Sequence, residues 1–151
     1  MKKVYLLGVF ALCILLSGCG EKKLLCSYSS TNSFYGSDEV LAKYYFKEDG
    51  TIDKYSINEK MVYNDAYLKS TNTTIDDQFK NAEEYCNSGL PESKNITCKA
   101  SKTKNIITVV IDYKLSKMTQ EEIDSLQLAD YISSKYDDIK TQYEGQGFTC
   151  K

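Results

Sequence analysis

Apolar and polar residues alternate with a period of two in several parts of the chain, a pattern typical of β-strands. The alternation is clearest around residues 47–50 (KEDG), which favour a tight turn because glycine readily adopts positive φ. The apolar positions before and after this turn are Val40, Ala42, Tyr44 and Phe46, then Tyr55, Ile57, Met61 and Tyr63. We therefore predict a β-hairpin from about residue 40 to residue 63.

Other strands complete the predicted sheet. Residues 24–29 can form an opening strand, and the C-terminal residues 148–150 can return to the sheet as a short extended piece. A second hairpin turns at residues 103–105, and its apolar positions are Ile96, Cys98 and Ala100, then Ile107, Val109, Ile111, Tyr113 and Leu115. The later strand is apolar on both faces near its start, so we expect it to be central.

Helical periodicity recurs between and after these strands. One apolar stripe consists of Ile75, Phe79, Ala82 and Cys86, and another of Ile132, Tyr136, Ile139 and Tyr143. Thr73 or Thr74 can cap the first helix and Gly89 can end it, while Thr119 and Glu122 form a capping box that opens a helical turn. The second stripe predicts one helix over about residues 130–144.

The order β-β-β-α-β-β-α predicts an α+β fold. We expect an antiparallel sheet of about five strands in two hairpins, with helices packed on one face. No internal repeat and no second domain is indicated, so residues 24–151 are expected to form a single extracytoplasmic domain.

The start of the chain has the parts of a bacterial lipoprotein signal. Lys2 and Lys3 are positive, and residues 4–16 form an apolar run too short to span a bilayer. The next positions match a lipobox, which implies lipidation of its cysteine and cleavage before it: Leu16, Ser17, Gly18 and Cys19. We expect a signal peptide over residues 1–18 and a lipidated tether over residues 19–23. The alternatives are an ordinary secretion signal with an incidental cysteine, or a buried N-terminal helix.

The mature domain retains four further cysteines: Cys26, Cys86, Cys98 and Cys150. An even number in a secreted domain favours two disulfides, with three possible connectivities. Cys86 lies on the apolar stripe of its helix and Cys98 on the inward side of the next strand, so we predict that they pair, which leaves Cys26 with Cys150. Zinc, redox or nucleophilic roles are weaker interpretations, because the cysteines lack short paired spacing, a C-x-x-C motif and a histidine partner.

The composition argues mainly against several functions. The formal charge is −2, and loss of Lys2 and Lys3 with the signal makes it 17 − 21 = −4, which gives no electrostatic footprint for nucleic acid. The chain has no histidine and no arginine, so it lacks an imidazole base and a guanidinium fork. We therefore expect no enzyme activity, no cofactor and no metal. Abundant Lys, Asn, Ile and Tyr fit the AT-rich genome of a low-GC Gram-positive bacterium.

Acidic and tyrosine side chains are the remaining candidates for a site. Adjacent acidic pairs such as Asp76-Asp77 could bind calcium or act as glycosidase carboxylates, but their positions favour solvated surfaces, and Asp112 is expected to face water. Tyrosine is common at binding surfaces, and the mature chain has 13 − 1 = 12 of them. We expect at least half to fill core and strand positions. Several on the uncovered face of the sheet would make that face a partner surface.

The whole arrangement resembles the YehR-like family of small bacterial lipoproteins, whose domain has no known function. The resemblance covers the signal, the lipobox, the order of hairpins and helices, and residues 113–118 (YKLSKM). It implies a fold and a location, without catalytic residues to transfer. The four mature cysteines depart from that family's pattern.

Three functions follow as hypotheses. We expect a non-enzymatic protein on the outer side of the cell membrane, held by lipid on Cys19, that binds an envelope protein or glycan. An inhibitor or accessory module of an extracellular enzyme is the alternative, and it would expose a contiguous aromatic patch. A hydrolase would need two carboxylates facing each other in a cleft.

Overall fold

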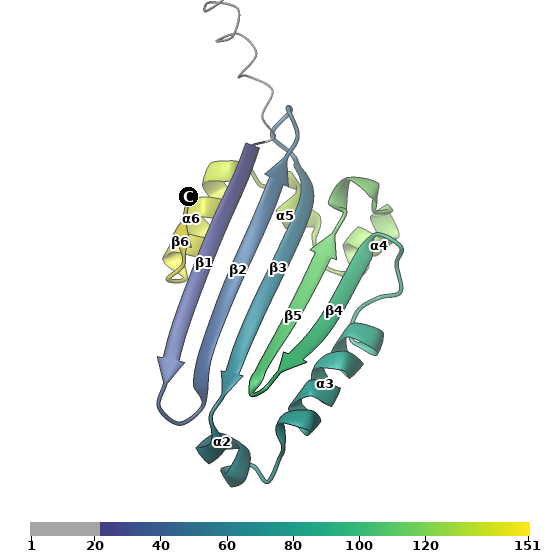
Figure 1. Ribbon diagram of the computed structural model, residues 1–151. Helices are drawn as coiled ribbons and strands as arrows, with labels where there is room; N and C mark the ends of the chain where they lie inside the picture. The colour runs from purple at the N-terminus through teal and green to yellow at the C-terminus, as the bar shows by residue number, and fades with distance from the viewer. Residues whose placement is uncertain (1–21) are drawn as a thin grey trace, which may run out of the picture.

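A computed structural model of the protein describes residues 22–151, so the signal, the lipobox and Cys19 lie outside the described residues. Residues 22–151 form an α+β fold in which a six-stranded antiparallel sheet is accompanied by five α-helices (Figure 1). None of the helices in this part of the chain is both long and apolar enough to cross a membrane.

The strands are β1 (Lys22–Asn32), β2 (Gly36–Phe46), β3 (Ile52–Tyr63), β4 (Ile96–Thr103), β5 (Ile106–Tyr113) and β6 (Thr149–Cys150). Their order across the sheet is β4-β5-β3-β2-β1-β6, and each neighbouring pair is antiparallel. Both predicted hairpins are present, and β5 is an interior strand as expected. The sixth strand is the short C-terminal return to the sheet. β1 begins at Lys22, so Lys22 and Lys23, which were expected in the tether, already pair with β2.

The helices are α2 (Asp65–Ser70), α3 (Ile75–Ser88), α4 (Gln120–Ser125), α5 (Ala129–Ser133) and α6 (Tyr136–Gly145), with a short 3-10 helix, η1 (Leu115–Lys117). Thr74, one of the two predicted caps, begins α3 through a capping box with Asp77, and Thr119 begins α4 through the predicted capping box with Glu122. The single helix expected over residues 130–144 is instead α5 and α6, because the backbone is extended at Ser134 and Lys135. The side chain of Asp138 accepts a hydrogen bond from the Lys135 N–H and so supports the new start.

The strand register places the predicted inward residues on one face of the sheet. One row across it is Leu24, Tyr44, Tyr55, Tyr113 and Ile96. We call the face that carries this row the core face, and the other, which carries Lys43, Ser56, Asp112 and Thr97, the polar face. Apolar side chains of α3 and of α6, including the fully buried Ile139, belong to the same core cluster as the inward residues. Asp112 is exposed, as predicted.

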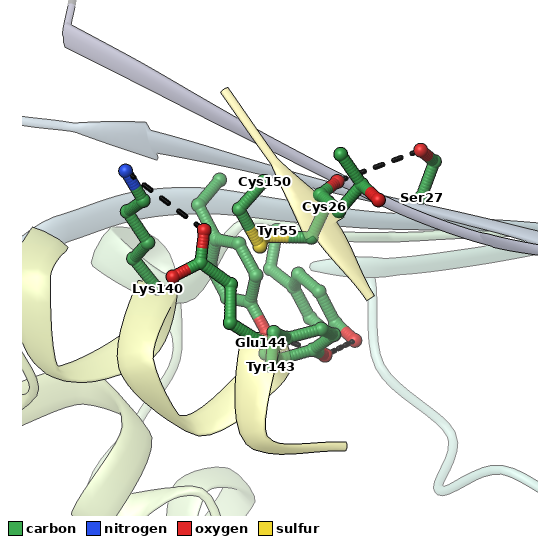
Figure 2. The surroundings of a disulfide bond; sticks show 9 residues. Cys26, Ser27, Tyr55, Lys140, Tyr143, Glu144 and Cys150 are labelled. Carbon is green, nitrogen blue, oxygen red and sulfur yellow. Dashed lines mark hydrogen bonds and ion pairs between the residues drawn. A yellow bond between two sulfur atoms is a disulfide. The ribbon is translucent and has the colours of Figure 1, made fainter. Parts of the chain in front are cut away.

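Two disulfides join the elements with the predicted connectivity. Cys26 of β1 pairs with Cys150 of β6, and Cys86 of α3 pairs with Cys98 of β4. Figure 2 shows the first of these beside the side chains of Tyr55 and Tyr143. The Cα atoms are 4.1 Å apart in the first pair and 5.1 Å apart in the second. The first disulfide therefore fastens the C-terminal strand to the opening strand, and the second fastens α3 to the edge of the sheet.

Candidate functional site

A pocket lies at the end of the sheet where β1 turns into β2 and where β3 leads into α2. Figure 1 shows this turn and α2 at the lower end of the sheet, opposite the end at which β1 begins. The pocket has a volume of 370 Å³, within the range of small-molecule sites. The residues that characterise it are Tyr35, Asp38, Glu59, Met61, Tyr63 and Tyr67. We call it the acidic pocket.

Two carboxylates come together there through the register of β2 and β3. Asp38 lies opposite Met61, and Glu59 precedes Met61 by two residues on the same strand. Alternation along the strands therefore puts both carboxylates on the core face as diagonal neighbours. The adjacent Glu39 is exposed on the polar face, where it binds Lys60 at 3.1 Å.

These carboxylates lie in surroundings that disfavour their charge. The Oδ1 atom of Asp38 is buried without a hydrogen-bond partner, and burial raises the pKa of this carboxyl. Burial, and then the charge of Asp38, raises the pKa of Glu59. Within residues 22–151 no lysine forms an ion pair with either carboxylate. Lys102, which lies on the core face of β4, forms an ion pair with Asp76.

Aromatic side chains form the wall of the pocket. The ring of Tyr67 lies 5.3 Å from that of Tyr35, 6.0 Å from that of Phe34 and 6.1 Å from that of Tyr63, measured between centroids. The Tyr63 hydroxyl donates to the sulfur of Met61 at 3.5 Å. Burial chiefly, followed by Tyr67 and the two carboxylates, raises the pKa of Tyr63. The Tyr63 hydroxyl therefore stays neutral.

Local sequence fixes the turn that carries this wall. The Asn32 side chain accepts hydrogen bonds from two backbone N–H groups of the turn, at 2.8 and 3.2 Å. The Asn64 side chain accepts a hydrogen bond from a backbone N–H in the first turn of α2, at 3.0 Å, and donates one to the carbonyl of Ser33, at 2.9 Å. Gly36 has a φ of 118°, and a Cβ there would lie 1.8 Å from the carbonyl oxygen of Val62. Only glycine fits this position, so the turn and α2 are held in place before any ligand binds.

A larger pocket, of 580 Å³, runs beside β6 and has less to offer a ligand. Its charged residues, Glu39 and Lys60, already neutralise each other. No group of three or more potential metal ligands occurs in the part of the chain that the structure describes. The acidic pocket is therefore the stronger candidate.

Of the residues singled out from the sequence, tyrosines line the acidic pocket and the others lie elsewhere. The four cysteines are held in the two disulfides. In the core, the Tyr143 hydroxyl forms hydrogen bonds with the hydroxyls of Tyr44, at 2.8 Å, and of Tyr55, at 3.1 Å. Burial raises the pKa of Tyr44 and of Tyr55. Among the tyrosines of β1, β2 and β3, Tyr45 alone lies on the polar face. An aromatic partner surface on that face is therefore not formed, and the aromatic cluster lies at the β1–β2 turn instead.

The sequence interpretation did not identify Asp38 or Glu59. A usable sign was present, because position 59 falls between Ile57 and Met61 in the inward set of β3. An acidic residue at an inward position of a strand is unusual unless it serves a site.

Comparison with known proteins adds no assignment. No protein-family model matches the sequence, and no match is found among curated proteins or among solved structures. The resemblance to the YehR-like family therefore stays a prediction.

Proposed function

We propose that the protein is a non-enzymatic, lipid-anchored binding module of the cell envelope, held by lipid on Cys19 and binding its ligand in the acidic pocket. The lipobox at residues 16–19 supports the anchor. In this proposal α3 and α6 cover parts of the core face, and the polar face is left bare.

The observation that carries the proposal is the place of the pocket in the fold. β1 begins at Lys22, near the expected anchor, and its 11 residues end at the turn that forms the pocket wall. At about 3.4 Å per residue this strand is about 35 Å long. In this proposal the pocket therefore faces away from the membrane, where an envelope ligand can reach it.

Hydrolysis fits the pocket less well than binding. A glycosidase places its two carboxylates on opposite sides of the scissile bond, in surroundings that push their pKa values apart. Here both carboxylates project from the same face of the sheet, and both pKa values are raised. The pair is suited to attracting positive charge.

An accessory module that docks on a protein is the second candidate. Phe34 and Tyr35 at the tip of the β1–β2 turn are 42% and 56% exposed, and their rings are in contact at 5.1 Å. This small patch is the type of surface that the accessory role requires.

Photocrosslinking in intact cells tests the binding proposal. A photoreactive phenylalanine analogue replaces Tyr67 in the pocket wall or, as the matched control, Tyr45 on the polar face. We expect an envelope product from position 67 that is absent from position 45. Identical products from the two positions, or none from position 67, would contradict the proposal.

A further inference from the structure

The acidic pocket has an excess of negative charge that the folded chain does not neutralise. Asp38 and Glu59 are diagonal neighbours on the core face, and the pocket is lined by no lysine. Of the charged residues on adjoining elements, Lys102 of β4 is paired with Asp76, and Asp65 and Lys69 of α2 lie outside the lining. The Oδ1 atom of Asp38 is buried and has no hydrogen-bond partner. A positive ligand in the pocket would stabilise the charged form of both carboxylates.

The aromatic wall selects among positive ligands. Tyr35, Tyr63 and Tyr67 line the same pocket as the two carboxylates. Aromatic ring faces attract ammonium groups within about 6 Å of their centroids. The hydroxyl of Tyr63 is directed to a sulfur atom, so it is not competing for the carboxylates. An organic cation thus gains from both parts of the pocket.

Other ligand classes match the pocket less well. A divalent metal ion needs more oxygen ligands than two carboxylates supply, and residues 22–151 hold no cluster of three or more metal-ligating side chains. An anion would meet two negative charges without a balancing cation. The volume of 370 Å³ suits a small molecule.

We infer that the acidic pocket binds a small organic cation with an ammonium head, which the carboxylates of Asp38 and Glu59 neutralise and the tyrosine rings enclose. This inference rests on the proposed binding function and names the ligand class for the same site.

Calorimetric titration of the purified full chain tests the inference with choline chloride and its uncharged carbon analogue, 3,3-dimethylbutan-1-ol, as probes. The two probes have nearly the same shape and differ in charge. We expect choline to bind about tenfold more tightly or better, since the analogue has no charge to pair with. Equal affinity of the two probes, or no saturable choline binding, would overturn the inference.

Substitutions in the pocket, and the pH dependence of the affinity, test where choline binds. Asp38→Asn and Glu59→Gln are each expected to weaken choline binding several-fold, while the matched controls Asp112→Asn and Glu39→Gln on the polar face leave it unchanged. The affinity of the wild-type chain for choline should rise with pH as the two carboxyl groups ionise. This measurement does not depend on the folding of any variant. Choline binding that is independent of pH and of both pocket variants would contradict the assignment.

Two further probes separate this inference from the proposed function. If calcium chloride or N-acetylglucosamine binds the pocket saturably and choline does not, the organic-cation inference is overturned. The proposed binding function would still stand. If no crosslinked product forms from position 67 in cells, the proposed binding function itself is contradicted.

Discussion

Glu59 shows how one residue can mark a site within an otherwise apolar strand. Its neighbours on the core face are Ile57 and Met61, of which Met61 packs against the core, and across the sheet it faces Val109. A carboxyl group here is costly in free energy, because burial and the charge of Asp38 both disfavour its ionised form. A residue that serves only the fold would be apolar at this position.

Replacing Glu59 with glutamine is expected to stabilise the protein at neutral pH. The pKa of Glu59 is raised on folding, so its contribution to stability is complete below the unfolded pKa and is lost as the pH rises through the folded pKa. The variant should therefore exceed the wild type in free energy of unfolding at about pH 7, by less than about 1 kcal/mol because water partly screens the group. Urea denaturation at about pH 3 and about pH 7 measures the difference.

The control for this prediction is Glu39→Gln, which removes a carboxyl from the polar face one position after Asp38. A stability gain at position 59 of the same size at both pH values would contradict the account.

At the scale of elements, periodicity predicted most of the fold. The sets 40–46, 55–63 and 107–115 were assigned to strands and their inward sides, and the first and third contain most of the buried residues of β2 and β5. The set 55–63 is only partly buried, and the buried residue of β3 is Ile52. Leu115, expected in the strand of the third set, is buried in η1 instead, because β5 ends at Tyr113. α2 was missed because six residues are too few to display helical periodicity, and its Asn64 cap was the only local sign. The site was not predicted because Asp38 and Glu59 meet through strand register, which is a non-local property of the sheet.

Replacing each disulfide pair with serines should destabilise the protein to different degrees. The Cys26–Cys150 bond closes a sequence separation of 124 residues, and the Cys86–Cys98 bond closes one of 12. Loop-closure entropy predicts losses of about 5 and about 3 kcal/mol, respectively. Chemical denaturation of the two double variants under identical conditions compares them. A larger loss from the Cys86–Cys98 pair would show that local packing, and not loop closure, sets the order.

At the scale of the whole molecule, the start of β1 and the pocket lie at opposite ends of the sheet. Cys19 precedes the first residue of β1 by three positions, a reach of about 10 Å at most. The domain is therefore expected to sit close to the membrane, with its pocket directed outward. This direction follows from attachment just before β1, which we propose to be through lipid on Cys19.

The mass of the N-terminal tryptic peptide, from protein extracted out of native membranes, tests this claim most directly. The account predicts residues 19–22 with diacylglycerol on the Cys19 sulfur, and no such peptide from a Cys19→Ala chain. A peptide in which residues 16–18 still precede an unmodified Cys19 would contradict it.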